Sequence, residues 1–263
     1  MRLTLSLCLL LLPSVAMAQE GVVTYDHAVQ YDFELPEGMA GRGGRGGDRA
    51  GRGAMPPGLP TESYASVVLL FSGSESVMRR VDEEEADDAD PQTAQRMAGF
   101  AARLRMGSSS RSDHETLLAA YADNSDGTLT ESIEFMGRTF LINGTRPAFE
   151  WRLVGEQSEF LGYLVQKAVA VHDSTTIEAW FTPEIPVSAG PGPYGGLPGL
   201  ILVLSVDSGH ELYSATDLAL REIEDGLVTR PAEGEQVSRE EYEGLVEEKM
   251  EEIRITRNRR RIR

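Results

Sequence analysis

Apolar and polar residues alternate through much of the chain, a pattern typical of β-strands with one solvent-facing side. The alternation is clear in residues 21–35 and 160–171, and residues 200–206 form a nearly continuous apolar run. Such a run indicates a strand that is covered on both faces. Further short strands are predicted at residues 67–71, 117–122, 128–135, 138–142, 149–154, 175–181, 211–213 and 218–223.

Turn signals separate these strands, and they favour antiparallel pairing. Asp126-Gly127 and Asn143-Gly144 are both dipeptides typical of tight hairpins. Strands that follow one another at intervals of ~8–12 residues indicate a sheet of antiparallel strands rather than alternating strands and helices. The pattern therefore predicts a mostly β fold of the α+β class.

The period of the apolar residues changes near the C-terminus, where a helix is expected. Ser238 and Glu241 have the spacing of a capping box, which marks the first turn of a helix. The apolar residues that follow share one helical face and predict that the helix packs on the sheet: Tyr242, Leu245, Val246, Met250 and Ile253. Residues 257–263 form a basic tail.

Two low-complexity segments interrupt this pattern at residues 38–60 and 82–113. The first is rich in Gly, Arg and Pro, and the second contains an acidic run, a predicted short helix at 93–105 and a Ser/Arg-rich stretch. We interpret both as insertions in one β-rich domain that spans residues 19–256, because neither has a strand-like period.

The first 18 residues have the features of a secretory signal peptide. Arg2 precedes an apolar run from Leu3 to Leu12, and the small residues Ala16 and Ala18 frame a cleavage site. We expect cleavage after Ala18 and a periplasmic or secreted location. Cleavage would remove one arginine, no acidic residue and the single cysteine, so the net charge would change from −17 to −18.

Composition limits the classes of partner. An acidic protein of net charge −17 lacks the basic surface that nucleic-acid binding requires. No segment of the mature chain has the length of a membrane-spanning helix. The Arg/Gly-rich residues 41–47 are therefore interpreted as a loop rather than as a nucleic-acid contact.

Recognised catalytic and metal-binding patterns are missing from the sequence. The four histidines, at positions 27, 114, 172 and 210, lack the spacing of metal ligands, and no nucleophile motif of a hydrolase occurs. Residues 123–127 resemble part of a calcium loop, but the glycine is misplaced and a hairpin turn is favoured. We predict a protein that is not an enzyme and that has no cofactor or metal.

Several motifs in residues 151–204 point to a known family. They are Trp151, the segment Leu161-Gly-Tyr-Leu-Val-Gln-Lys-Ala168, the segment Ala179-Trp-Phe-Thr-Pro-Glu-Ile-Pro186, and the hexapeptide Gly196, Leu197, Pro198, Gly199, Leu200 and Ile201. Together they resemble the GLPGLI family (Porph_ging type), a group of exported bacterial proteins of uncharacterised activity. The hexapeptide has no titratable group, so the residues favour a structural turn over a ligand contact.

The resemblance implies a curved antiparallel sheet or half-open barrel, similar to envelope lipoprotein carriers, with the C-terminal helix packed on it. In that interpretation Trp180, Tyr194 and Leu197 line the mouth of an apolar cavity that binds a lipid or other amphiphile. The alternative is an interaction module for an outer-membrane or other envelope protein. Glu184 is expected to accept hydrogen bonds in a turn.

Overall fold

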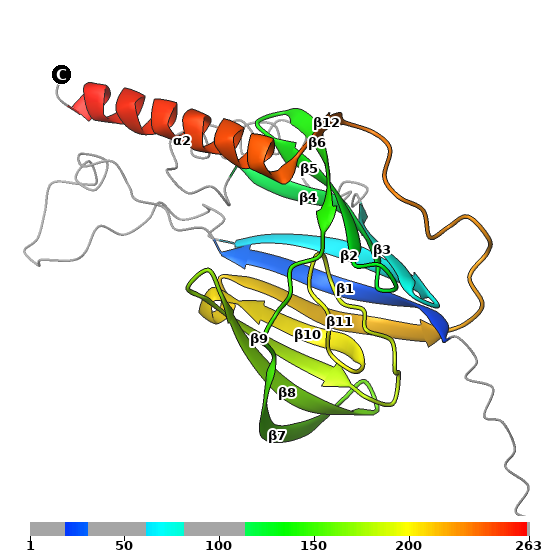
Figure 1. Cartoon of the computed structure of the whole chain (residues 1–263). Coiled ribbons are helices and arrows are strands. Elements are labelled where there is room, and N and C mark those ends of the chain that lie inside the picture. The colour runs from blue at the N-terminus through cyan, green and yellow to red at the C-terminus, as the bar shows by residue number, and fades with distance from the viewer. Residues whose placement is uncertain (1–18, 31–61, 82–113, 262–263) are drawn as a thin grey trace, which may run out of the picture.

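The computed structural model describes residues 19–30, 62–81 and 114–261, which form one large sheet with a helix at one end (Figure 1). The predicted signal peptide, both insertions and the helix expected at 93–105 lie outside the described residues. The strands are β1 (Glu20–Gln30), β2 (Glu62–Ser72), β3 (Glu75–Val81), β4 (Glu115–Asp123), β5 (Thr128–Phe135), β6 (Arg138–Thr145), β7 (Arg152–Phe160), β8 (Tyr163–His172), β9 (Thr175–Thr182), β10 (Leu200–Val206), β11 (Glu211–Leu220) and β12 (Glu235–Val237).

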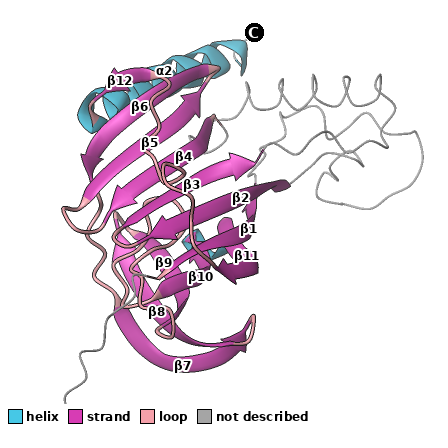
Figure 2. Ribbon diagram, turned by 90° about the vertical axis from the view of Figure 1, so that its right-hand side faces the viewer, coloured by secondary structure: helices cyan, strands magenta, loops and turns pink. Residues whose placement is uncertain are grey.

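These 12 strands form a single sheet in the order β12-β6-β5-β4-β3-β2-β1-β11-β10-β9-β8-β7. Every pairing is antiparallel except that of β12 with β6, which is parallel. The mostly β, largely antiparallel fold is thus confirmed, but the sheet is mixed and does not close on itself. Figure 2 shows how the sheet twists from the end at β6 to the end at β7.

The predicted hairpin at residues 123–127 is confirmed. It joins β4 to β5, and the Asp123 carboxylate accepts the backbone N–H of Ser125 at 2.8 Å. The hairpin expected at Asn143-Gly144 is wrong, because both residues lie inside β6 and pair with β5. The chain instead leaves β6 near one end of the sheet and crosses through residues 146–151 to β7 at the other end (Figure 1).

A second hairpin divides the strand that was predicted at residues 160–171. Leu161 and Gly162 both have positive φ angles, 50° and 80°, and they connect β7 to β8. Phe160 and Tyr163 are direct cross-strand partners and share a face, so the two-residue turn shifts the phase of the alternation between β7 and β8.

The C-terminal helix α2 (Arg239–Arg261) begins as predicted and packs on the end of the sheet. The Ser238 hydroxyl accepts the N–H of Glu241 at 3.2 Å, and the Glu241 carboxylate accepts the N–H of Ser238 at 2.8 Å. The helix packs on β5 and β6 through a cluster that contains Ile133, Phe135, Phe140, Ile142, Tyr242 and Val246, with Leu245 and Met250 at its border. The helix continues to Arg261 and so includes most of residues 257–263, which the sequence predicts as a basic tail.

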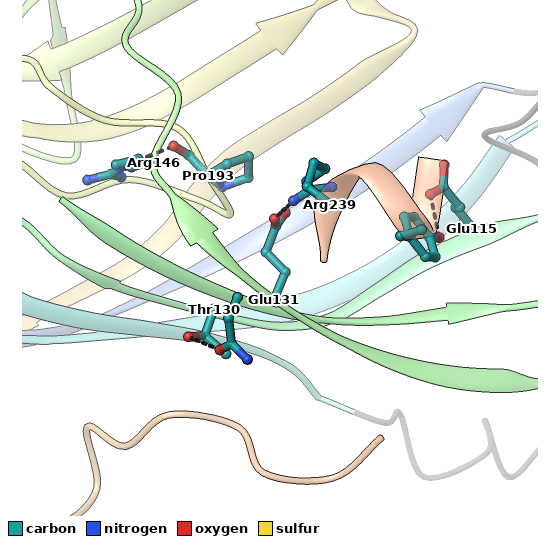
Figure 3. A network of polar contacts seen from close by, with 8 residues as sticks. Glu115, Thr130, Glu131, Arg146, Pro193 and Arg239 are labelled. Carbon is teal, nitrogen blue, oxygen red and sulfur yellow. Dashed lines mark hydrogen bonds and ion pairs between the residues drawn. The ribbon is translucent and has the colours of Figure 1, made fainter. Parts of the chain in front are cut away.

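Polar contacts fix the first turn of α2 to the sheet. Arg239 forms an ion pair with Glu131 of β5, and the Tyr242 hydroxyl donates a hydrogen bond of 2.6 Å to Glu115 of β4 (Figure 3). Within the described residues, no helix is long and apolar enough to cross a membrane.

The main core lies between the sheet and the connection from β9 to β10, residues 183–199. One face of the sheet, which we call the inner face, carries buried residues such as Tyr25, Phe71 and Phe181. The connection contributes Ile185 and Leu197 to the same cluster. The chain therefore covers the inner face of its own sheet.

Candidate binding site on the sheet

The hexapeptide of the sequence motif lies at the end of this connection, and Arg146 holds the connection in place. Arg146 follows β6 and donates hydrogen bonds to the backbone carbonyls of Pro193 at 2.9 Å and Ser188 at 3.2 Å (Figure 3). It donates further bonds to the Tyr194 carbonyl and to the Asn124 side chain. Burial lowers the pKa of Arg146 to about 10, so the guanidinium stays charged at neutral pH.

The glycines of this region have geometric roles. The Trp151 indole donates a 2.7 Å hydrogen bond to the Gly195 carbonyl, and Gly196 has a φ of +84°. A Cβ atom on Gly199 would lie 2.7 Å from the carbonyl carbon of Thr182. The motif thus makes a tight turn that starts the buried strand β10, in agreement with the structural interpretation of its residues.

The structure separates the three residues that the sequence placed at one cavity mouth. Leu197 is buried in the core, with 2% of its surface exposed. Tyr194 stacks on Phe149 with ring centroids 5.4 Å apart. Trp180 lies between the buried Ala179 and Phe181 of β9, so strand alternation directs its side chain to the opposite, outer face of the sheet.

On that outer face, Trp180 lines a pocket of about 140 Å³. The other lining residues come from β7, β8 and β10: Ser158, Phe160, Val165 and Val203. Trp180 is the direct cross-strand partner of Val203 on one side and of Lys167 on the other. The pocket wall is therefore mostly apolar and includes two aromatic rings.

Three charged residues surround Trp180 on the outer face. The Lys167 ammonium lies 5.8 Å from the centroid of the Trp180 ring, a cation–π contact. It is 3.1 Å from the Glu178 carboxylate and 3.9 Å from that of Glu156. The hydrogen bond that Lys167 donates to Glu178 and the charges of both carboxylates raise the pKa of Lys167, although partial burial opposes this.

Residues 166–203 match the model of the Porph_ging family, described as a protein of unknown function. The chain carries the Porph_ging segment. The resemblance that the sequence motifs indicated is thereby confirmed. The Porph_ging segment contains the hexapeptide and also Lys167, Glu178, Trp180 and Val203, so it supplies much of the outer pocket as well as the turn into β10.

Comparisons outside the family add little. No curated protein is significantly similar to the chain. Two structures of PNGF-II, in space groups P21 and C2, are similar with 15% sequence identity and a TM-score of 0.49. The match covers 87% of this chain and 33% of the PNGF-II chain, so this chain spans about a third of that protein.

Sequence reasoning identified Trp180 but missed its neighbours in the pocket. Phe160 and Val165 lie on either side of the β7–β8 hairpin, which the sequence pattern placed in one continuous strand. Val203 became a neighbour of Trp180 through a register shift between Ile201 and Val203 that strand alternation alone does not reveal. The cross-strand pairing of Trp180 with Lys167 becomes evident only from the register of β8 and β9.

A second polar cluster lies between β1 and β11. His27 contacts Glu211 at 3.0 Å and stacks on Tyr213, whose hydroxyl donates a 2.8 Å hydrogen bond to the same carboxylate. Burial alone would raise the pKa of Glu211, but the contacts with His27 and Tyr213 lower it overall. No group of three or more metal-ligating side chains occurs in the part of the chain that the structure describes.

Glu184, in the connection after β9, has the role that its sequence context predicted. Its carboxylate accepts the backbone N–H of Leu164 at 3.0 Å, and its own N–H donates to the Thr182 hydroxyl at 3.3 Å. The residue thus joins the connection to the start of β8.

Proposed function

We propose that this protein is an exported, non-enzymatic binding protein of the cell envelope, and that it binds a small apolar group in the outer pocket. The observation that carries the proposal is the pocket itself, in which the aromatic rings of Phe160 from β7 and Trp180 from β9 line one apolar wall. Export is supported by the signal-peptide pattern of residues 1–18.

The size of the pocket limits the ligand. A closed apolar cavity of about 150 Å³ holds one benzene molecule, and the outer pocket has about 140 Å³. The inner face, where a lipid carrier would hold an acyl chain, is covered by the 183–199 connection. The geometry therefore favours one ring or one short alkyl group over a whole acyl chain.

The chemistry of the wall supports binding rather than catalysis. Ser158 supplies the one hydroxyl group of the lining residues, and none of these residues is a histidine or carboxylate that could act as its base. A wall of aromatic and aliphatic side chains with a few polar groups is typical of ligand sites.

The test uses the two tryptophans of the chain as reporters. Protein labelled with 5-fluorotryptophan gives two ¹⁹F resonances, and titration with benzyl alcohol should shift the Trp180 resonance while Trp151 stays constant. Val203→Phe and Ser158→Leu should each fill the pocket and abolish the shift. The matched control is Val171→Phe on β8, at a valine that is 65% exposed. Equal shifts in all variants would contradict the proposal.

A second candidate function, an interaction module for an envelope protein, is favoured by a different observation. The β7–β8 hairpin carries five of the 12 large hydrophobic side chains that are exposed in the described residues: Leu153, Val154, Leu161, Leu164 and Val171. Among the described strands, β7 pairs with β8 alone and is an edge of the sheet.

The edge itself is poorly suited to strand addition, so a partner would contact these side chains. The pairing of β7 shifts register between Leu153 and Gln157, and such bulges protect edges from further pairing. A photo-reactive amino acid at Leu161 should cross-link one envelope protein in cells. The same group at Leu227, of equal exposure (41% against 42%), should not. Identical adducts from both positions would contradict this function.

A further inference from the structure

We infer that the outer pocket selects a small amphiphilic amine, whose apolar part enters the pocket while its cationic end lies at the rim beside Glu156 and Glu178. This inference rests on the proposed function and names the class of ligand. It follows from how the three charged residues around Trp180 are exposed.

The Lys167 ammonium beside the pocket is largely shielded from solvent, whereas the Glu178 and Glu156 carboxylates are exposed. The Lys167 side chain is 18% exposed, whereas those of Glu178 and Glu156 are 43% and 60% exposed. Lys167 lies over the Trp180 ring, so its charge is already partnered by the ring and by Glu178. A ligand that approaches from solvent therefore meets mainly negative charge.

The charges at the rim also do not cancel. The Lys167 ammonium lies within 4 Å of two carboxylates, so these three side chains together carry one net negative charge. Glu156 lies on the same face as the pocket, because its carboxylate is 3.9 Å from the Lys167 ammonium, which lies over the Trp180 ring. Arg152 also faces outward, because it pairs with Val169 of β8, the partner of Glu178, but it lies farther along β7 from Ser158 than Glu156 does.

The overall charge acts in the same direction. The chain has a net charge of −17, and a field of this sign raises the local concentration of cations and lowers that of anions. A phosphate or carboxylate head group would be repelled by both the rim and the whole molecule. An amine is attracted both by the rim and by the net charge of the molecule. Its apolar part can be as small as one ring, which is the size that the pocket accommodates.

The experiment compares three ligands that share a phenyl group and differ in charge. Benzylamine, benzyl alcohol and phenylacetate are titrated against the 5-fluorotryptophan-labelled full chain, and the Trp180 resonance gives each Kd. We expect benzylamine to bind about three- to tenfold more tightly than benzyl alcohol and phenylacetate to bind most weakly, a preference that 0.5 M NaCl should reduce.

Two charge variants locate the effect. Glu156→Gln should remove most of the preference for benzylamine over benzyl alcohol. Glu159→Gln, on the same strand but on the opposite face, should retain it. Equal binding of all three ligands, or tighter binding of phenylacetate, would overturn the inference and leave the pocket as an apolar site. If none of the three ligands moves the Trp180 resonance, both the inference and the proposed function fail.

Discussion

The guanidinium of Arg146 occupies the space where a side chain on Gly195 would begin. A Cβ atom at that position would lie 2.5 Å from Cζ and 2.7 Å from Nη1 of Arg146. The absence of a side chain at Gly195 thus allows a half-buried cation to reach three carbonyl groups of the 183–199 connection. Because this connection covers the inner face of the sheet, the close contact of Arg146 with Gly195 links the motif to the main core.

Gly195→Ala should destabilise the protein by about 2–4 kcal/mol, because Arg146 must leave its acceptors while its charge stays partly shielded from water. The matched control is Gly144→Ala in β6, where a Cβ atom would meet nothing within 4 Å. That variant should change the free energy of unfolding by less than about 1 kcal/mol. Urea unfolding followed by circular dichroism measures both values. Similar effects of the two substitutions would contradict the role of Arg146.

Gly199→Ala should destabilise more than Gly196→Ala, although both glycines belong to the same hexapeptide. A Cβ atom on Gly199 would overlap the Thr182 backbone, which cannot move without displacing β9. Gly196 has a φ of +84°, but a Cβ atom there would only make ordinary contact with Trp151 at 3.8 Å, so alanine costs about 1 kcal/mol of backbone strain. Thermal unfolding of the two variants gives the order. The reverse order would show that the close approach of Gly199 to the Thr182 backbone does not determine the cost of a side chain at Gly199.

The sequence predicted the features that depend on local pattern. The capping box at Ser238 and Glu241, the apolar face of α2 and the turn at residues 123–127 were all recovered, because each depends on residues within a few positions of one another. Propensity and periodicity contain this information directly.

The features that depend on distant residues were not predicted. Asn143-Gly144 has the composition of a hairpin, but the strand that pairs with β6 on the side away from β5 is β12, which lies about 90 residues later in the chain. The crossing from β6 to β7 and the placement of Arg146 under the motif follow from that topology. Trp180 was separated from Leu197 for the same reason, since strand alternation fixes the face of Trp180 only once its register is known.

The contact between His27 and Glu211 leads to a prediction at acidic pH. The pKa of Glu211 in the folded state is below its ordinary value of 4.5, so its contribution to stability is present above pH 4.5 and is lost as the pH falls further. Glu211→Gln should lower the free energy of unfolding by about 1–2 kcal/mol at pH 7. This difference should shrink at pH 3.5. Glu159→Gln, at an exposed carboxylate, is the control and should have little effect at either pH. If Glu211→Gln is less stable than the wild type by the same amount at pH 7 and at pH 3.5, this role of Glu211 is contradicted.

Tyr25 leads to the opposite prediction at alkaline pH. Its side chain is fully buried and its hydroxyl donates a 2.6 Å hydrogen bond to the Ile201 carbonyl at the start of β10. Burial raises the pKa of Tyr25 above its ordinary value of 10.0, so the folded state retains a proton that the unfolded chain releases.

The free energy of unfolding should therefore fall as the pH rises above 10, by about 1.4 kcal/mol per pH unit for this one group. Tyr25→Phe should be less stable than the wild type by about 1–3 kcal/mol at pH 8, because the Ile201 carbonyl loses its partner. The deficit should shrink by pH 11, since phenylalanine has no proton to lose. Urea unfolding at the two pH values measures the change, with the exposed Tyr64→Phe as control. If Tyr25→Phe and the wild type lose stability in parallel between pH 8 and pH 11, Tyr25 is not the group that limits alkaline stability.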